Sequence, residues 1–376
     1  MYIKRFIEEP VTADVNQKMV FIGGPRQCGK TSLAKHLLEK SVPDPSDRYL
    51  NWDALDDREN IMREQFPSGG GLIVLDEIHK YSRWRQTVKG LYDKRGDELK
   101  ILVTGSARLD LYRRGGDSLQ GRYHYFNLFP FSLSELGGAS PSTLQDLLMY
   151  GGFPEPFLRA SEEHSRRWSR AYRFHLVRED LRDLERVYDL DSIEKMVYRL
   201  PDLVGSPLSV NALREDLGVS HQSVTRWLQM LENLYMIFRL YPFGAPRLRA
   251  VKKEAKHYHL DWTLIKEEGY RFENMVACHL LKWCRFVEDT EGYDMELRYF
   301  RDVDRREVDF VLVKDGTPIY FVECKLKAKE AGRALRYLKE RFPDVPAAQI
   351  SMEGGQDVMT KEGIRLCPAH VFLAEF

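Results

Sequence analysis

A glycine-rich turn between an apolar run and an amphipathic segment is the feature that most constrains this chain. The apolar run covers residues 19–22, and the segment after the turn places apolar side chains at helical spacing over residues 33–38. The turn itself, residues 24–31, satisfies the pattern G-x-x-x-x-G-K-[ST]. The sequence therefore predicts a strand, a phosphate-binding loop and a helix in that order.

Each fixed position of this pattern has a physical role in holding a nucleotide. The glycines let backbone N–H groups converge on phosphate oxygens, beside the positive end of the helix dipole. Lys30 is expected to reach the β- and γ-phosphates, and the Thr31 hydroxyl to bind Mg²⁺. The predicted nucleotide-binding residues of the loop are Gly24, Pro25, Arg26, Gln27, Cys28, Gly29, Lys30, Thr31 and Ser32. ATP and Mg²⁺ are the predicted cofactors, although the pattern does not distinguish ATP from GTP.

A second apolar run, residues 71–75, ends in two carboxylates. Parallel strands covered by helices read as continuous apolar runs, and their chemistry lies at their carboxyl ends. Asp76 is expected to hold Mg²⁺ through water, and Glu77 to polarise the attacking water. A third run, residues 100–103, ends in hydroxyls, so Thr104 and Ser106 are both candidates to orient that water or to sense the γ-phosphate.

Length, charge and cysteine content limit the number of domains and the kinds of partner that the chain can have. A chain of 376 residues is expected to form two or three domains, because single cores rarely exceed about 250–300 residues. Lys plus Arg equals Asp plus Glu at 57 each, so only local patches could attract nucleic acid. The five scattered cysteines argue against zinc and against a disulfide framework. Neither a signal peptide nor a membrane-length apolar run is recognisable, which predicts a cytoplasmic protein without a membrane partner.

Further motifs follow the phosphate loop in a fixed order. They are L-D-E-I at 75–78, T-G-S-A at 104–107, L-x-G-R at 119–122, Pro-x-Ser-x-x-Glu at 130–135 and G-G-F-P at 151–154. This ordered set resembles the AAA+-type ATPases of archaea and bacteria that carry a C-terminal domain of unknown function. The resemblance makes Arg122 a candidate for γ-phosphate contact, in the same chain or from a neighbouring subunit, against the alternative of a solvated surface arginine. Arg108 stands where that family more often has a hydroxyl, and it is the second candidate.

Residues 208–231 have the pattern of two helices separated by Gly218. Ser209 or Asn211 is expected to cap the first helix and Ser220 the second, and a strand follows within residues 234–241. This arrangement is typical of a helix-turn-helix of the winged variety. The candidate DNA-binding residues early in the second helix are Gln222, Ser223, Thr225 and Arg226. A lid or a protein-docking module is the alternative reading.

Near the C-terminus, residues 306–313 and 318–326 read as two strands joined at a D-G hairpin turn. Side chains alternate along a strand, so Glu323 and Lys325 share a face, and Asp309 lies on the neighbouring strand. Paired carboxylates hold Mg²⁺, and a lysine beside them can activate water for phosphodiester cleavage. A salt bridge on a hairpin is the alternative.

These residues resemble the restriction-endonuclease-like family, whose motif is an acidic residue followed by (D/E)-x-K. The resemblance implies that Asp309, Glu323 and Lys325 are catalytic and that Asp309 and Glu323 are metal ligands. Glu273, on a predicted helix, matches the helical acid of that family and is the further predicted metal ligand. Whether such a site is active or vestigial is left open by the sequence.

Together these patterns predict an α/β protein of three parts. They are a P-loop ATPase domain at 1–155 with an AAA+-like parallel sheet, a helical lid and winged-helix region at 156–250, and a PD-(D/E)xK nuclease-like domain at 251–376. The leading hypothesis is an ATP-hydrolysing protein coupled to a domain that binds, and in its active form cleaves, DNA. The alternative is a nucleotide-dependent switch or scaffold that binds a protein partner and carries an inactive nuclease-like domain. The oligomeric state stays open, and a homo-oligomer is compatible with the sequence.

Overall fold

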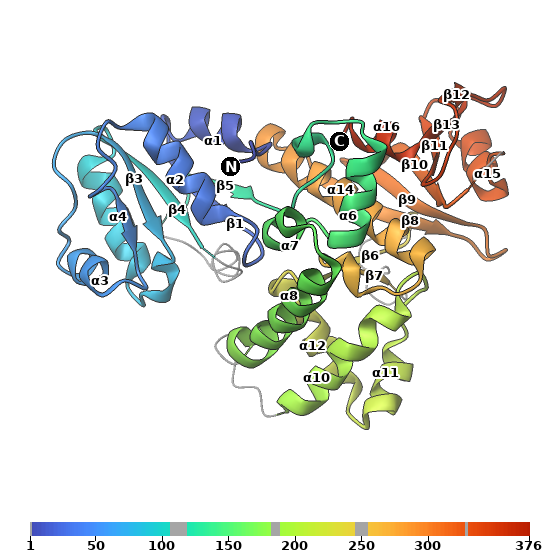
Figure 1. The fold of residues 1–376 in the computed structure, drawn as a ribbon, viewed down its shortest axis with the longest axis horizontal. Helices are drawn as coiled ribbons and strands as arrows, with labels where there is room; N and C mark the ends of the chain where they lie inside the picture. The colour runs from blue at the N-terminus through green and yellow to red at the C-terminus, as the bar shows by residue number, and fades with distance from the viewer. Residues whose placement is uncertain (1, 106–118, 182–188, 245–254, 328–329) are drawn as a thin grey trace. The chain divides into compact units, whose positions relative to one another are not determined.

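The computed structural model describes residues 2–105, 119–181, 189–244, 255–327 and 330–376 (Figure 1). The chain forms two compact units, Met1–Pro130 and Phe131–Phe376. The division into three domains near residues 155 and 250 stays a prediction. Within the described ranges, no helix combines the length and the apolar character needed to cross a bilayer.

A five-stranded sheet forms the centre of the first unit, in the order β2-β3-β4-β1-β5. Every neighbouring pair in this sheet is parallel. The strands are β1 (Met19–Gly23), β2 (Tyr49–Asn51), β3 (Gly71–Asp76), β4 (Leu99–Thr104) and β5 (Tyr123–Asn127). All of β1 and nearly all of β3 are buried, as expected for strands covered on both faces. The parallel α/β sheet predicted from the apolar runs is confirmed.

In the described part of the first unit, four helices and a short 3-10 turn accompany this sheet. They are α1 (Glu8–Asp14), α2 (Lys30–Ser41), α3 (Leu55–Met62), η1 (Ile78–Lys80) and α4 (Trp84–Arg95). Phe21 of β1 stacks on Tyr123 of β5 with ring centroids 4.4 Å apart, and the same ring contacts Trp84 of α4. Apolar side chains of β3, β4 and α4 complete this core, which holds the ends of β1 and β3 in fixed positions.

The second unit begins with a largely helical part. Its elements are η2 (Ser134–Leu136), α6 (Pro141–Tyr150), α7 (Pro154–Arg159), α8 (Glu162–His175), η3 (Leu176–Asp180), α10 (Leu190–Arg199), η4 (Leu200–Leu203), α11 (Val210–Leu217) and α12 (His221–Asn233). Serine or aspartate side chains cap several of these helices by accepting a backbone N–H of the first turn. The caps are Ser140 for α6, Ser161 for α8, Asp189 for α10, Ser209 for α11 and Ser220 for α12.

The predicted pair of helices at 208–231 is present. Gly218 ends α11 in the left-handed conformation with φ +67°, which a residue without a Cβ adopts at low cost. Of the two predicted caps for this helix, Ser209 accepts the hydrogen bond, from Ala212 N–H. After α12, strand β6 (Ile237–Leu240) pairs antiparallel with β7 (Lys256–His259).

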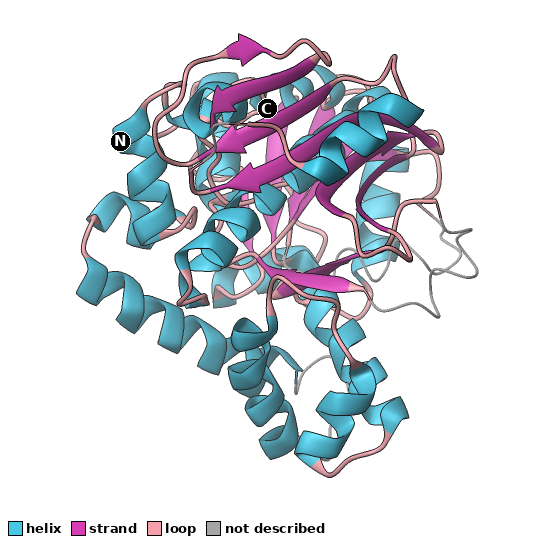
Figure 2. Ribbon diagram, turned by 90° about the vertical axis from the view of Figure 1, so that its right-hand side faces the viewer, coloured by secondary structure: helices cyan, strands magenta, loops and turns pink. Residues whose placement is uncertain are grey.

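A six-stranded mixed sheet forms the other part of the second unit, in the order β12-β13-β11-β10-β9-β8 (Figure 2, magenta strands at the top). The strands are β8 (Met295–Arg301), β9 (Glu307–Lys314), β10 (Thr317–Lys325), β11 (Ala347–Ser351), β12 (Val358–Met359) and β13 (Ile364–Pro368). Parallel pairing joins β10 to β11 and β11 to β13, and the other pairs are antiparallel.

The predicted hairpin between β9 and β10 is confirmed. Asp315 and Gly316 both have positive φ, at +49° and +79°, as a two-residue type I′ turn requires. Helix α14 (Glu268–Glu291) contacts β8, β9 and β10, helix α15 (Arg333–Arg341) contacts β9, β10 and β11, and α16 (Ala369–Leu373) ends the chain.

Candidate nucleotide site and carboxylate centre

The phosphate loop lies between β1 and α2, where the sequence predicted it. Gly24 has φ +133° and Gly29 has φ +100°, a region that side chains with a Cβ rarely enter. A Cβ on Gly24 would also lie 2.1 Å from the carbonyl oxygen of Leu128, after β5. Both glycines are therefore required by the backbone path of the loop.

Lys30 is the first residue of α2, and its side chain folds back over the loop. The buried ammonium donates hydrogen bonds to the carbonyl oxygens of Gly24 at 3.0 Å and Pro25 at 2.6 Å. A phosphate in the loop would offer this ammonium a charged acceptor, which is a stronger partner than a carbonyl. The position of Lys30 suits the phosphate contact that the sequence predicted for it.

Asp76 lies at the carboxyl end of β3 and collects hydroxyl donors from three other elements. Thr31 Oγ1 of α2 donates to Asp76 Oδ2 at 2.9 Å, Tyr49 of β2 donates to the same oxygen, and Thr104 of β4 donates to Oδ1. Burial, and then the Asp76 charge, raise the pKa of Tyr49. A threonine hydroxyl beside a carboxylate is a set of hard oxygen donors of the kind that Mg²⁺ prefers. The residues present thus fit an Mg²⁺–nucleotide.

Glu77 follows β3 in a strained backbone conformation. Its φ of +56° lies in the left-handed region, which is uncommon for a residue other than glycine and is concentrated at functional sites. Its N–H is held by Thr104 O at 3.0 Å, and Lys80 Nζ lies 3.4 Å from its Oε2. Burial raises the pKa of Glu77 against the opposing effect of Lys80. A carboxylate with a raised pKa beside a phosphate loop is suited to accept a proton from water.

The predicted contact of Arg122 is not brought to the loop within this chain. Arg122 comes just before β5, where its carbonyl accepts Met19 N–H at the first residue of β1. The phosphate loop follows the last residue of β1, whereas Arg122 precedes the first residue of the parallel strand β5. Arg122 therefore lies at the amino-terminal ends of these strands and the loop at their carboxyl ends. Its guanidinium donates to Asp93 at 2.8 Å, which raises its pKa. Ser106 and Arg108 lie outside the described residues.

Arg5 is a residue of this unit that the sequence patterns did not indicate. Its buried guanidinium donates to Cys28 O in the phosphate loop at 2.8 Å and to Phe129 O after β5. Cys28 Sγ adds a bond to Leu128 O at 3.3 Å. The loop is therefore fastened to the segment after β5 by a side chain outside every nucleotide-binding motif, and one arginine near the N-terminus gives no sequence signal.

In the second unit, the predicted hairpin residues do come together. The register pairs Phe310 with Val322, which makes Asp309 and Glu323 cross-strand neighbours. Cys324 N–H donates to Asp309 Oδ2 at 2.7 Å, and Lys325 Nζ lies 2.8 Å from Glu323 Oε1. Burial raises the pKa values of both Asp309 and Glu323.

Glu273 of α14 joins this neighbourhood together with two residues that the sequence did not indicate. Its Oε1 accepts from Tyr258 OH at 2.8 Å and from Lys256 Nζ at 3.2 Å. The Lys256 ammonium, on a side chain only 1% exposed, also lies 2.6 Å from Glu307 Oε1. Burial, and then the Asp309 charge, raise the pKa of Glu273 to about 7. Lys256 was missed because its partners are 17 or more positions away in the sequence.

The predicted metal ligands of this region, Asp309, Glu323 and Glu273, each have partners within the protein. Within the described ranges, no three His, Cys, Asp or Glu side chains are grouped so that they could hold one ion. Asp309 is bonded to a backbone N–H, Glu323 is paired with Lys325, and Glu273 with Lys256. The roles of Asp309, Glu323, Lys325 and Glu273 in metal binding and catalysis stay predictions.

The candidate DNA-binding residues lie in the first two turns of α12. Gln222, Thr225 and Arg226 are exposed, whereas Ser223 is half-buried and its N–H is accepted by Ser220 Oγ at 3.0 Å. Thr225 Oγ1 donates to the helix backbone at His221 O, 3.0 Å away. Thus Gln222 and Arg226 are the predicted contacts best placed to reach a partner.

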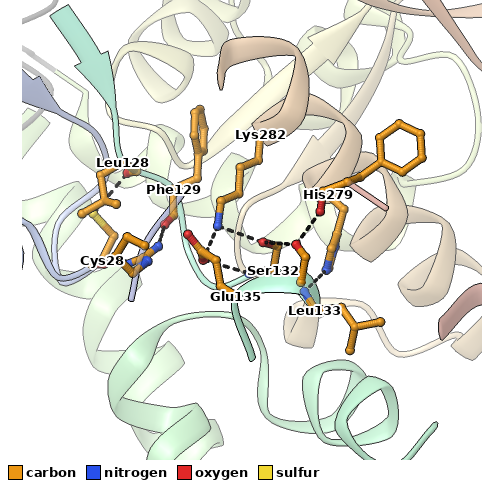
Figure 3. A network of polar contacts seen from close by, with 11 residues as sticks. Cys28, Leu128, Phe129, Ser132, Leu133, Glu135, His279 and Lys282 are labelled. Atoms are coloured by element: carbon orange, nitrogen blue, oxygen red, sulfur yellow. Dashed lines mark hydrogen bonds and ion pairs between the residues drawn. The ribbon is translucent and has the colours of Figure 1, made fainter. Parts of the chain in front are cut away.

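The Pro-x-Ser-x-x-Glu segment has a structural role at the start of the second unit. Glu135 forms an ion pair with Lys282 of α14, and Lys282 also donates to Ser132 Oγ at 3.1 Å (Figure 3). Leu133 N–H donates to His279 Nε2 at 3.1 Å, so the other ring nitrogen carries the proton and donates to Met275 O. This motif anchors η2 on α14.

Three family models match successive parts of the chain. Residues 16–137 match an AAA domain, residues 141–267 a domain of unknown function (DUF8612), and residues 268–372 a domain of unknown function (DUF4143). The first unit therefore carries an AAA-type, P-loop NTPase-like domain, which confirms that part of the prediction. The restriction-endonuclease-like fold of the last part stays a prediction.

Relatives cover most of the chain at low identity. An uncharacterized protein of Mycobacterium tuberculosis is 26% identical over 348 residues, covering 89% of this chain and 76% of that protein. One from Haemophilus influenzae is 25% identical over 335 residues, covering 80% of each. Among solved structures, ORC1 of Aeropyrum pernix in complex with DNA is 14% identical, with a TM-score of 0.34, covering 74% of this chain and 93% of that one. At this TM-score nothing about function follows for the present chain.

Proposed function

We propose that the first unit binds and hydrolyses ATP and that the second unit binds DNA. The observation that carries the ATPase half is the contact between Thr31 and Asp76 at 2.9 Å, beside Lys30 in a glycine-rich loop. It supports this half because a hydroxyl and a carboxylate that hold Mg²⁺, and an ammonium that holds phosphate, are the parts that phosphoryl transfer requires.

Each residue has one task in this proposal. Lys30 leaves the Gly24 and Pro25 carbonyls and binds the phosphates. Thr31 and Asp76 would hold Mg²⁺, which when bound would neutralise charge on the phosphate oxygens. Glu77 orients a water molecule and takes its proton. Its raised pKa brings it nearer to the range in which a carboxylate is an effective base at neutral pH.

Phosphate release from ATP and Mg²⁺ tests this half. Lys30→Ala should abolish nucleotide binding, whereas Glu77→Gln should keep binding and lower the turnover by at least about 100-fold. Lys40→Ala is the matched control, because Lys40 is on the same helix but pairs with Glu8 at the other end. Unchanged turnover in Lys30→Ala and Glu77→Gln would refute the assigned roles.

The DNA-binding half rests on α11, α12 and the β6–β7 pair, which together have the element order of a winged helix. The exposed side chains of Gln222 and Arg226 in the first turns of α12 support it, because the start of the second helix meets the major groove in such modules. Cleavage is not included in the proposal, because Glu323 Oε1 is paired with Lys325 and Glu273 Oε1 with Lys256.

Fluorescence anisotropy of labelled duplex DNA tests this half, with and without ATP. Arg226→Ala should weaken binding and reduce the slope of log affinity against log salt by about 1 if this residue meets a phosphate. Arg166→Ala is the control, because Arg166 is also an exposed helical arginine but lies on α8, outside the predicted helix-turn-helix. If the wild type binds no DNA in either nucleotide state, the alternative of a protein-binding switch is favoured instead.

A further inference from the structure

Three of the carboxylates gathered at the hairpin lie close to two of the protein's own cations. Lys256 Nζ lies 3.2 Å from Glu273 Oε1 and 2.6 Å from Glu307 Oε1, and Lys325 Nζ lies 2.8 Å from Glu323 Oε1. Two ammonium groups thus face the carboxylates to which a nuclease of this kind would bind its metal. The two lysines differ, because the Lys325 side chain is 46% exposed and that of Lys256 is 1% exposed.

The buried ammonium of Lys256 needs compensating interactions at this position. Removing an ion from water costs several kcal/mol, and only close opposite charges and hydrogen bonds recover that cost. Glu273 and Glu307 are the charges that recover it, because their Oε1 atoms lie 3.2 Å and 2.6 Å from Lys256 Nζ. Lys256 is therefore held charged, with its ammonium among the carboxylates of α14 and β9.

Lys256 reaches this position because of the fold. It begins β7, where it pairs with Leu240 of β6, and α14 packs against β7. Tyr258, on the same face two residues later, donates to the same oxygen of Glu273. Strand β7 therefore brings a cation and a hydroxyl to Glu273, which leaves this carboxylate oxygen with two donors already bound.

We infer that Lys256 takes the place of a divalent cation, so that the carboxylate centre of the second unit is completed by an ammonium and not by Mg²⁺. The sharing of Lys256 between Glu273 and Glu307 supports this, because a bridging cation between carboxylates is the role that a metal would fill. The absence of a metal-binding group of three among the described residues agrees with it.

The geometry around Glu323 is consistent with a structural centre as well. A Cβ on Gly332 would lie 2.4 Å from Glu323 Oε2, so the backbone before α15 closes tightly over this carboxylate. Gln349 of β11, the register partner of Glu323, accepts the N–H of Gly332 at 2.7 Å. Gln349 thus holds the backbone before α15 against the sheet, with Glu323 packed close beneath it.

Binding of Mn²⁺ to the nucleotide-free full chain, followed by the electron paramagnetic resonance of the free ion, tests this inference. Every sample carries Asp76→Asn, which removes the metal-binding carboxylate of the first unit. With Lys256 intact, no Mn²⁺ site should be detected in the second unit. Lys256→Met keeps an unbranched side chain of similar length and removes the charge, so it should create one Mn²⁺ site per chain. The affinity of the second unit for Mn²⁺ should be at least about tenfold higher than in the protein that carries Lys256.

Two further variants fix the location of that site. Glu273→Gln added to Lys256→Met should abolish the new site, whereas Lys325→Ala alone should not create one. Tight Mn²⁺ binding with Lys256 intact that is lost in Glu323→Gln or Asp309→Asn would overturn the inference. A folded Lys256→Met protein, judged by near-ultraviolet circular dichroism, that gains no site would overturn it as well.

A second measurement needs no change at Lys256 and so does not depend on the folding of that variant. The unfolding midpoint of the second unit should not change with Mg²⁺ when Lys256 completes the centre. A rise in the midpoint with Mg²⁺ that disappears in Glu323→Gln would show a resident metal and contradict the inference. Neither readout involves ATP turnover or DNA, so failure here is distinct from failure of the proposed function.

Discussion

Thr31 Oγ1 donates a hydrogen bond to Asp76 Oδ2 at 2.9 Å, which joins the first turn of α2 to the end of β3. Asp76→Asn keeps the shape of this contact but replaces one acceptor oxygen by an amide that can only donate. At least one of the three hydroxyl donors then loses its acceptor, and the carboxylate charge that attracts Mg²⁺ is gone. We expect ATP turnover to fall by at least about 100-fold.

Phosphate release over a range of Mg²⁺ concentrations measures this effect. Asp93→Asn is the matched control, because Asp93 is an exposed aspartate of the same unit that pairs with Arg122. Turnover in Asp76→Asn that recovers fully at high Mg²⁺ would show that the carboxylate only raises metal affinity. Turnover equal to that of the control would remove Asp76 from the site.

Tyr49 donates to the same Asp76 oxygen as Thr31, from the neighbouring strand β2. Tyr49→Phe deletes one hydroxyl and leaves Asp76 with the two threonine donors, so the carboxylate stays charged. A hydrogen bond to a charged group contributes about 1.5–3 kcal/mol. The free energy of unfolding of Tyr49→Phe should therefore be lower than that of the wild type by an amount in this range. Urea denaturation measures it, and a change below about 0.5 kcal/mol would show that this contact contributes little.

Arg5 fastens the phosphate loop to the segment after β5 through Cys28 O and Phe129 O. Arg5→Met keeps most of the buried stem and leaves both carbonyls without this donor. Each such carbonyl costs about 1–3 kcal/mol, so the first unit should be strongly destabilised. Nucleotide affinity should also weaken, since the loop loses its attachment to the β5 side of the sheet.

Thermal unfolding and nucleotide titration of Arg5→Met separate these two effects. Lys4→Met is the matched control, because Lys4 is the adjacent residue and its partner Glu9 is exposed. Weaker nucleotide binding in a variant that remains folded at the assay temperature is the expected result. Equal stability and equal affinity in the Arg5 and Lys4 variants would contradict the role of Arg5.

The sequence predicted those parts of the molecule that depend on local pattern. The phosphate loop, the parallel strands ending at Asp76 and Thr104, and the D-G hairpin between β9 and β10 are each encoded within a short stretch. Arg5, Tyr49 and Lys256 are different, because each acts on residues at least 17 positions away. No periodicity or turn signal marks such contacts.

The carboxylate centre of the second unit shows the same limit of prediction from local sequence patterns. The spacing of Asp309, Glu323 and Lys325 predicted their proximity, since alternation and hairpin register are local properties. It did not predict Lys256, because the contact between β7 and α14 forms only when these two elements pack together in the fold. In the sequence they are separated by η5 (Trp262–Leu264). A motif therefore specifies which side chains meet on one hairpin, while the charge balance of the site depends on the whole fold.

Burial lowers the pKa values of three histidines, His257, His259 and His279, and this predicts how stability depends on pH. Burial lowers the pKa values of His257 and His279 to about 4, so both are neutral in the folded protein at pH 5 and are protonated on unfolding. The unfolded state then binds more protons, and stability falls as pH decreases from about 6.5 towards 4. Each histidine should remove about 2 kcal/mol between pH 7 and pH 5. Glu273, with its pKa raised to about 7, acts with the opposite sign over part of this range.

His279→Gln isolates one of these contributions, because only the histidine term changes between the two proteins. Gln can still accept the Leu133 N–H that His279 Nε2 accepts in the wild type, but it does not titrate. Urea denaturation at pH 7 and pH 5 should therefore show a smaller loss of stability in the variant, by about 2 kcal/mol. His164→Gln is the control, because His164 is partly exposed at the first turn of α8. An unchanged pH dependence in His279→Gln would mean that His279 keeps an ordinary pKa in the folded chain, and that its hydrogen bond to Leu133 does not hold it neutral.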